Sequence, residues 1–111
     1  MKKILVIDDY LSSREVMVDF LSKTGDYKFF KASDGKEGIK MFDSWCPDIV
    51  IIDLGIHGVR AEELVRLIKK NPQNKTKVIV LCGRDDLDRE PMTKAAGCDV
   101  FLKKPFHLLQ L

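Results

Sequence analysis

The chain of 111 residues predicts an α/β fold with one parallel sheet, and two observations support that prediction. Short apolar runs alternate with segments of helical periodicity along the whole chain. Four of the five runs are continuously apolar, which is typical of strands covered on both faces. The second run is more mixed and indicates an edge strand. The predicted strands are 3–7, 29–31, 48–52, 77–81 and 100–103.

The first two predicted helices have start and stop signals in the sequence. Ser12 and Glu15 have the spacing of a capping box ahead of the first helix. The second helix is predicted over residues 35–44, and Pro47 prevents its continuation. Both helices carry apolar residues at helical spacing, so each has a face to bury against the sheet.

The later helices are predicted to be shorter. Asp88 is a candidate cap for a fourth helix in which Pro91 occupies the first turn, and Gly97 would end it. A fifth helix would begin near His107, and we expect it to be truncated or abbreviated because the sequence reaches only Leu111. The third helix is predicted from an apolar stripe: Ala61, Leu64, Leu67 and Ile68.

Composition favours a single soluble, cytoplasmic domain over residues 1–111. The 19 basic residues are scattered among 17 acidic ones, so no basic stripe indicates nucleic acid. No apolar run approaches the ~20 residues of a membrane span, and the N-terminus lacks the pattern of a signal peptide. Three cysteines in separate segments favour reduced thiols over a disulfide framework: Cys46, Cys82 and Cys98.

Carboxylates stand at the ends of two predicted strands. Asp8 and Asp9 follow the first strand, and Asp53 follows the third. Sites in open doubly wound sheets form beyond the carboxyl ends of the strands, where the strand order reverses. If strands one and three are neighbours in the sheet, that point lies between them and the three carboxylates would converge. Two carboxylates about 5 Å apart repel by ~3 kcal/mol at an effective dielectric of about 20, and a magnesium ion removes that repulsion.

Lys104 extends this arrangement. It follows the fifth strand and precedes Pro105, so its ammonium would reach the same sheet edge. Three carboxylates and one ammonium suit a divalent cation and a phosphoryl group. Each residue also has a simpler interpretation, since Asp8 and Asp9 could cap a helix and Lys104 could be a solvated surface side chain. Their shared position at strand ends favours a site.

Several motifs occur in a fixed order along the chain. They are 4–9 (ILVIDD), 34–35 (DG), 47–54 (PDIVIIDL), 96–99 (AGCD) and 101–106 (FLKKPF). With this set the chain resembles a response-regulator receiver domain of bacterial two-component signalling, in the CheY-like superfamily. The resemblance covers essentially the whole chain. It implies a flavodoxin-like, doubly wound sheet of five parallel strands in the order 2-1-3-4-5.

The resemblance also implies roles for matching residues. Asp53 would be the phosphoacceptor, phosphorylated by a sensor histidine kinase or a histidine phosphotransfer protein. Asp9, Asp53 and the backbone carbonyl of Gly55 would bind Mg²⁺ directly, and Asp8 would hold the ion through water. Lys104 would pair with the phosphoryl oxygens. Such a domain accepts a phosphoryl group and promotes its own phosphorylation and dephosphorylation, but it is not an enzyme in the usual sense.

The end of the fourth strand departs from the family pattern. Cys82 and Gly83 stand where the family usually has a Thr-Ala pair, whose hydroxyl donates to the phosphoryl group. The aromatic residue on strand five that follows this hydroxyl is present as Phe101, and Gly83 still offers its backbone N–H. A thiol is a much weaker donor than a hydroxyl, so we expect a weakened conformational response that Cys82→Thr would enlarge. Cys82 and Phe101 also fit ordinary core packing.

The loop after Asp53 departs from the pattern too. Ile56 and His57 replace the usual Met-Pro, and Arg60 and Ala61 replace the usual Asp-Gly. Ile56 still supplies an apolar anchor. We expect His57 to face solvent without a functional role, as most loop histidines do.

The sequence supports two hypotheses of different kinds. The first is a Mg²⁺-dependent phosphoacceptor switch that can form a homodimer through the face of the fourth helix, fifth strand and fifth helix. The alternative is a receiver-like interaction module whose switching is weakened or lost, as Cys82 suggests. A phosphatase of the haloacid-dehalogenase type would need Asp-x-Asp after strand one, whereas Asp9 is followed by Tyr10 and Leu11.

Overall fold

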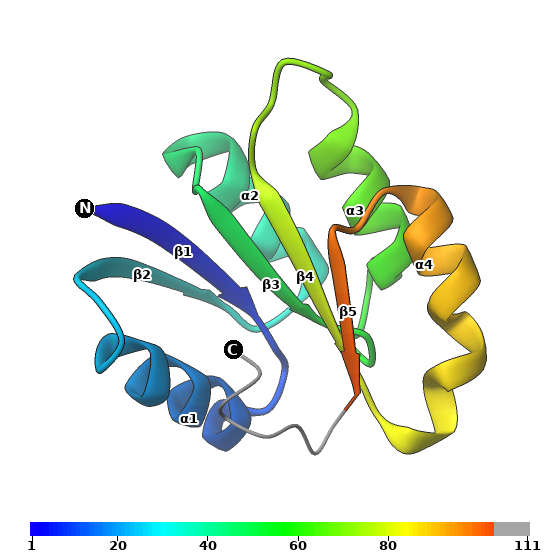
Figure 1. The fold of residues 1–111 in the computed structure, drawn as a ribbon, viewed down its shortest axis with the longest axis horizontal. Coiled ribbons are helices and arrows are strands. Elements are labelled where there is room, and N and C mark those ends of the chain that lie inside the picture. The colour runs from blue at the N-terminus through cyan, green and yellow to red at the C-terminus, as the bar shows by residue number, and fades with distance from the viewer. Residues whose placement is uncertain (104–111) are drawn as a thin grey trace.

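The computed structural model describes residues 1–103, apart from the side chains at positions 84, 85 and 87. Five parallel strands form one sheet in the order β2-β1-β3-β4-β5, with helices on both faces (Figure 1). The predicted doubly wound, flavodoxin-like fold is confirmed, and β2 lies at an edge as its mixed sequence indicated. The predicted fifth helix and Lys104 lie outside the described residues.

Strands and helices alternate along the chain. The strands are β1 (Lys2–Ile7), β2 (Tyr27–Ala32), β3 (Ile49–Asp53), β4 (Lys77–Cys82) and β5 (Val100–Lys103). The helices are α1 (Leu11–Ser22), α2 (Gly35–Trp45), α3 (Ala61–Lys69) and α4 (Glu90–Ala96), and a 3₁₀ helix, η1 (Arg84–Arg89), leads directly into α4. Within the described residues, no helix combines the length and apolar character needed to cross a bilayer.

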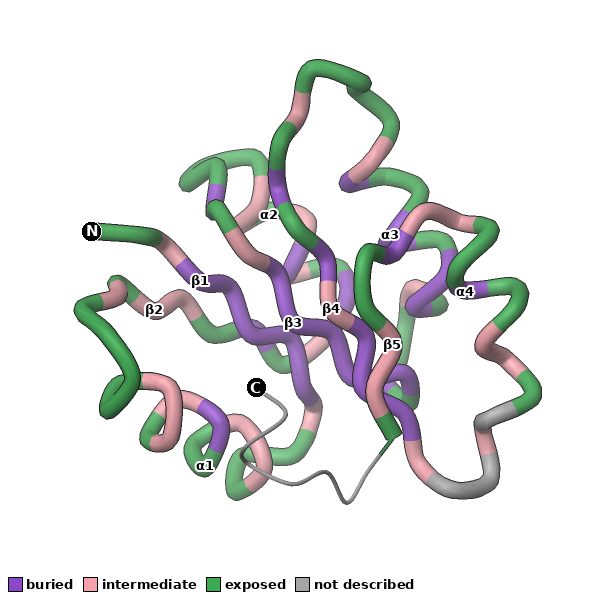
Figure 2. The backbone as a smooth tube through the Cα atoms, viewed as in Figure 1, coloured by how far each residue is buried: buried purple, intermediate pink, exposed green. Residues whose placement is uncertain are grey.

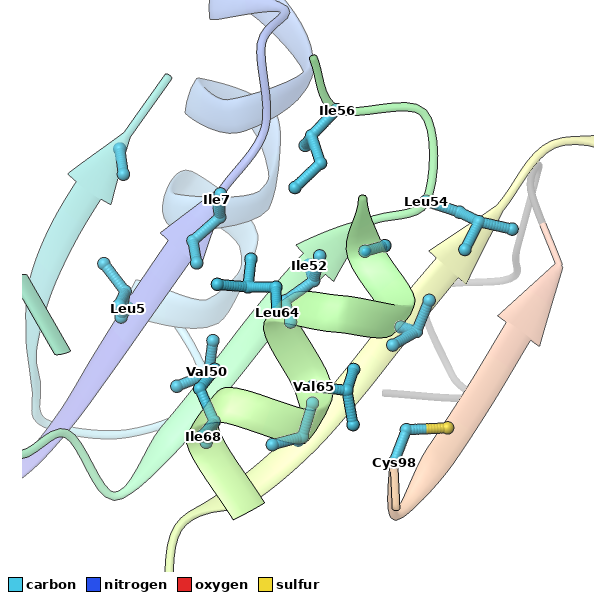
Figure 3. Close-up of a cluster of buried hydrophobic side chains, with 14 of the residues drawn as sticks. Leu5, Ile7, Val50, Ile52, Leu54, Ile56, Leu64, Val65, Ile68 and Cys98 are labelled. Carbon is cyan, nitrogen blue, oxygen red and sulfur yellow. The ribbon is translucent and has the colours of Figure 1, made fainter. Parts of the chain in front are cut away.

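Each face of the sheet has its own hydrophobic core. Figure 2 shows burial running through the central strands β1, β3 and β4. In β1, Leu5 and Ile7 pack with α2 and α3 (Figure 3), whereas Ile4 and Val6 pack with α1 on the opposite face. All four side chains are at most 2% exposed. Successive strand residues point to opposite faces, so two covered faces explain the continuous apolar sequence.

The start of α1 differs from the prediction. Tyr10 is the N-cap, and no side chain caps the helix. Ser12 therefore lies inside the first turn, while Glu15 accepts a hydrogen bond from Lys31 of β2 at 3.0 Å. The predicted capping box is wrong because Asp8 Oδ1 accepts the backbone N–H of Tyr10 at 3.0 Å, which directs the chain into the helix two residues before Ser12 would cap it.

Helix α2 lies unusually close to β1. Its N-cap is Asp34, whose carboxylate accepts the backbone N–H of Glu37 at 2.8 Å. A Cβ added to Gly38 would lie 2.5 Å from the side chain of Ile7, so a larger residue here would force Ile7 or the helix to shift. Cys46 ends the helix in the left-handed conformation, with φ of 47°. The close contact holds the end of β1 that leads into the acidic pair.

Helix α3 buries a slightly different stripe from the predicted one. Ala61, Leu64 and Ile68 are at most 1% exposed, as predicted. Leu67 is 43% exposed, however, and Val65 is fully buried in its place. The prediction for Leu67 is wrong because positions three and four residues apart share a helix face, and this register selects 61, 64, 65 and 68.

The start of α4 also differs from the prediction. Arg89 occupies the N-cap position with a helical backbone, and no side chain caps the helix. Asp88 is not the cap, because η1 carries the chain through this position in a 3₁₀ conformation. Pro91 lies in the first turn and Gly97 ends the helix with φ of 115°, as predicted.

Candidate functional site

An acidic cluster lies at the carboxyl edge of the sheet, between β1 and β3. Ile7 and Ile52 are partners in the parallel register, so Asp8 and Asp53, which follow them, stand side by side. One carboxylate oxygen each from Asp8, Asp9 and Asp53 lies within 4.8 Å of the other two. The predicted convergence of the three carboxylates is confirmed.

The loop that carries Asp8 is held from two sides. The N–H of Asp8 donates to the carbonyl of Ala32 in β2 at 3.1 Å. The carbonyl of Asp8 accepts a hydrogen bond from Nη1 of Arg14 in α1 at 2.8 Å. Asp8 itself is only 4% exposed. These bonds tie the acidic loop to the sheet and to the first helix, so the carboxylates are positioned by the fold.

Asp9 offers an oxygen that suits a cation. Among the described residues, Oδ1 of Asp9 is buried and has no hydrogen-bond partner. A buried acceptor without a partner is destabilising, and a divalent cation can supply the missing interaction. Mg²⁺ prefers carboxylate, carbonyl and water oxygens, so this donor set fits it.

His57 contacts the cluster from the loop after β3. Its side chain is 85% exposed, as expected, yet Nδ1 lies 2.5 Å from Oδ2 of Asp9. The predicted exposure is confirmed, and the absence of a functional role stays a prediction; the contact with Asp9 was not anticipated. His57 therefore contacts one oxygen of the carboxylate whose other oxygen has no hydrogen-bond partner among the described residues.

The segment after Asp53 curves back beside its carboxylate. The N–H of Ile56 donates to the carbonyl of Asp53 at 3.2 Å, and Ile56 is 8% exposed, which fits the predicted apolar anchor. A Cβ added to Gly55 would lie 3.4 Å from Oδ2 of Asp53. The backbone of Gly55 is therefore close enough to contribute to a cation site at this carboxylate.

The ends of β4 and β5 flank the cluster. Leu81 is the register partner of Asp53, and Cys82 follows it as a fully buried residue. Burial raises the pKa of the Cys82 thiol, so the group stays protonated and behaves as a small apolar side chain. Gly83 follows at the edge of the sheet, and Phe101 of β5 packs against the core that also contains Cys82.

Some charged residues near the site were not identified from the sequence. Arg14 donates to the carbonyl of Asp8 from six residues away, a spacing that helical periodicity does not indicate because Asp8 lies outside α1. Glu62 is 2% exposed and pairs with Arg89, which lies 27 residues further along the chain. The Arg89 hydrogen bonds hold the pKa of Glu62 below its usual value of 4.5. No local pattern could have revealed this pair.

A doubly wound sheet with three carboxylates beside its first and third strands defines a receiver-like signalling domain, and comparisons with known proteins identify the family. Residues 4–111 match the response regulator receiver domain. Sporulation initiation phosphotransferase F of Bacillus subtilis is 28% identical over 107 residues, covering 96% of this chain and 85% of the relative. Response regulator MprA of Mycolicibacterium vanbaalenii is 32% identical over 109 residues, covering 98% and 46%. A receiver-domain structure from Clostridium thermocellum has a TM-score of 0.89 at 31% identity, covering 98% and 86%.

The chain therefore belongs to the family of response-regulator receiver domains of two-component signalling. Members of this family typically bind Mg²⁺ at an acidic cluster, and this chain has such a cluster. Membership also implies interaction with histidine kinases or phosphotransfer proteins. The chain spans less than half the length of MprA, but most of the sporulation phosphotransferase.

Proposed function

We propose that the chain is a phosphoacceptor domain in which Asp53 receives a phosphoryl group in a Mg²⁺-dependent reaction. The acidic cluster within 4.8 Å is the observation that carries this proposal. Asp9, Asp53 and the carbonyl of Gly55 would hold the ion directly, and Asp8 would hold it through water. Bound Mg²⁺ neutralises charge between the carboxylates and the incoming phosphoryl group.

The residues of the chain divide the remaining work between them. A carboxylate oxygen of Asp53 attacks the phosphorus of a phosphohistidine, forming an aspartyl phosphate while the P–N bond breaks and the donor imidazole leaves. The bonds to Ala32 and Arg14 keep the acidic loop in place during this step. Lys104 and the N–H of Gly83 would face the phosphoryl oxygens. The chain is then an acceptor that is consumed once per transfer, not a conventional enzyme.

A small phosphodonor tests this proposal directly. Incubation with acetyl phosphate and Mg²⁺ should add one phosphoryl group per chain, detected by intact mass spectrometry. Asp53→Asn and excess EDTA should each abolish the addition. Asp48→Asn is the matched control, because Asp48 directly precedes the opposite end of the same strand, where its side chain accepts the N–H of Lys3 at 2.8 Å. No addition to the wild-type chain would favour an interaction module without switching.

The partner and the assembly follow from the same proposal. The donor would be a sensor histidine kinase or a histidine phosphotransfer protein in the cytoplasm, and transfer from a phosphohistidine protein to Asp53 would test it.

The face formed by α4 and β5 is a candidate homodimer surface, since Met92 and Val100 are 50% and 40% exposed there. Sedimentation with and without acetyl phosphate would show whether phosphorylation promotes pairing.

A further inference from the structure

A partly buried salt bridge joins α3 to the junction of η1 and α4. Glu62, in the first turn of α3, is 2% exposed. Arg89 donates to it twice, from Nε to Oε2 at 2.8 Å and from Nη2 to Oε1 at 2.6 Å. Two charge-assisted bonds in a fork define both side-chain positions more narrowly than one ion pair does. Helices α3 and α4 pack side by side in this part of the fold (Figure 1).

The third nitrogen of the same guanidinium reaches the backbone beside the proposed phosphoacceptor. Nη1 of Arg89 donates to the carbonyl of Leu54 at 3.3 Å. Leu54 directly follows Asp53, is 1% exposed, and donates its own N–H to the carbonyl of Leu81 at 2.8 Å. One guanidinium therefore contacts both the start of α3 and the peptide that follows Asp53.

Arg89 is also fixed to α4. It is the last residue of η1 and the N-cap of α4. Thr93, which is fully buried, donates its hydroxyl to the carbonyl of Arg89 at 2.7 Å. Helical segments that change from 3₁₀ to α often act as hinges, because the 3₁₀ hydrogen bonds have poorer geometry. A displacement of the Arg89 side chain would therefore act directly on the start of α4.

Glu62 has a second guanidinium within reach. Nε of Arg60 lies 3.7 Å from Oε1 of Glu62, and the Arg60 side chain is 69% exposed. If Arg89 moves away, Arg60 can approach and prevent Glu62 from becoming an uncompensated buried charge. Glu62 can thus be paired in two arrangements, one that holds α4 and one that releases it. Coupling between two sites requires a two-state element of this kind.

We propose that Arg89 is a positioning residue through which the state of Asp53 controls α4. A change in the peptide after Asp53 weakens its contact with Arg89, and Glu62 then exchanges Arg89 for Arg60. This coupling rests on the proposed function of Asp53. A route through Cys82 is weak by comparison, because its buried thiol is a poor hydrogen-bond donor.

NMR of isotope-labelled protein tests the coupling, with beryllium fluoride and Mg²⁺ as the mimic of an aspartyl phosphate. Binding to the wild-type chain should shift the amide resonances of α4. The variant that combines Glu62→Met with Arg89→Met should still bind beryllium fluoride, while the α4 shifts should fall about threefold. Glu63→Met with Arg66→Met is the matched control, because it removes an exposed pair at 3.2 Å from the same helix. The control should respond like the wild type.

Each result supports or overturns the coupling. Equal α4 shifts in the wild type and the Glu62 and Arg89 variant overturn it, as does wild-type binding that leaves α4 unchanged. Absence of binding by the wild type overturns the proposed function and the coupling together. A second variant, Arg89→Lys, tests the coupling if the double variant fails to fold. Lys keeps the positive charge toward Glu62 but cannot also bond the Leu54 carbonyl. Reduced α4 shifts in Arg89→Lys support the coupling, and unchanged shifts overturn it.

Discussion

Carboxylates at the amino end of the sheet lie apart, and each accepts hydrogen bonds from its own donors. At the carboxyl end, oxygens of three carboxylates lie within 4.8 Å of one another. At the amino end, Asp48 accepts the N–H of Lys3 at 2.8 Å. Asp99 accepts the N–H of Val78 at 2.8 Å and pairs with Lys69 at 2.7 Å. Each of these carboxylates ties neighbouring segments together, so its contribution is to the stability of the fold.

The carboxyl end has a different arrangement. Asp8, Asp9 and Asp53 lie within 4.8 Å of one another, and Oδ1 of Asp9 is buried without a partner among the described residues. Like charges at this separation oppose folding and favour a cation. Glu62 is the exception at this end, because its fork with Arg89 makes it a structural carboxylate. The difference separates residues that hold the fold from residues that prepare a binding site.

Empty space alone does not mark the site. An open hollow of about 740 Å³ lies at the amino end, near the ends of α2 and α3. Its lining carries charges of both signs, and it includes Asp43, Asp48, Lys70 and Lys75. At the acidic cluster, three carboxylate oxygens lie within 4.8 Å of one another, and this convergence indicates a cation site more clearly than the hollow does.

The largest effect on stability is expected where the structural carboxylate loses its partner. Arg89→Met should lower the free energy of unfolding by about 3 kcal/mol, because Glu62 would remain charged in a buried position. Arg60 lies 3.7 Å away and limits the loss. Urea denaturation measures the change. Adding Glu62→Met should restore most of the stability, and an Arg89→Met variant as stable as the wild type would contradict this role.

The next largest effect on stability is expected for a carboxylate at the amino end of the sheet. Asp99→Ala should lower the free energy of unfolding by about 2 kcal/mol, because the buried N–H of Val78 loses its acceptor and Lys69 loses its carboxylate partner, although Lys69 keeps the carbonyl of Thr76. Mg²⁺ affinity should not change. Asp19→Ala is the control, since Asp19 and Lys23 form an exposed pair at 3.4 Å, and the expected change there is below about 0.5 kcal/mol. An equal loss of unfolding free energy in Asp99→Ala and Asp19→Ala would contradict a structural role for Asp99.

A carboxylate at the carboxyl end should behave in the opposite way. Asp9→Asn should raise the free energy of unfolding by about 1 kcal/mol in EDTA, because repulsion within the cluster is reduced. The same change should weaken Mg²⁺ binding at least about tenfold, because a direct ligand charge is lost. Urea denaturation and calorimetric titration with Mg²⁺ measure the two effects. A loss of stability with unchanged Mg²⁺ affinity would place Asp9 among the structural carboxylates.

Much of the fold and part of the site could be predicted from the sequence. Asp8, Asp9 and Asp53 were identified because apolar runs end at them, and parallel strands bring such ends to one edge. The missing hydroxyl at Cys82 was identified differently, by comparison with the family's usual Thr-Ala pair. The three carboxylates depend on the order of residues along single strands, so one sequence is enough to reveal them.

The remaining features depend on contacts between distant segments. The pair of Glu62 and Arg89 forms only after α3 and α4 pack together, so residue spacing contains no trace of it. His57 reaches Asp9 through the path of a loop that no periodicity specifies. The start of α1 was misplaced because the Asp8 carboxylate accepts the N–H of Tyr10, the N-cap, and the helix therefore begins ahead of Ser12. Tertiary contacts override local signals in each case.

The smallest effect is a difference in the response to acid. The pKa of Glu62 is held below 4.5 by its bonds to Arg89, so the pair contributes its full stability above that pH. This contribution is lost as the pH falls through the lowered pKa and Glu62 is protonated. As the pH falls from about 6 to about 3, the free energy of unfolding should therefore decrease less in the variant that combines Glu62→Met with Arg89→Met than in the wild type. Parallel declines would contradict the assignment.

Fluorine NMR of beryllium fluoride tests most directly whether the cluster of Asp8, Asp9 and Asp53 is a metal-assisted phosphoacceptor site. In the wild-type chain, a bound signal should appear only when Mg²⁺ is present. The signal should vanish in Asp53→Asn, weaken in Asp9→Asn and persist in Asp48→Asn, the carboxylate change at the other end. A bound signal that survives either the removal of Mg²⁺ or the Asp53→Asn substitution would contradict a metal-assisted phosphoacceptor at this edge of the sheet.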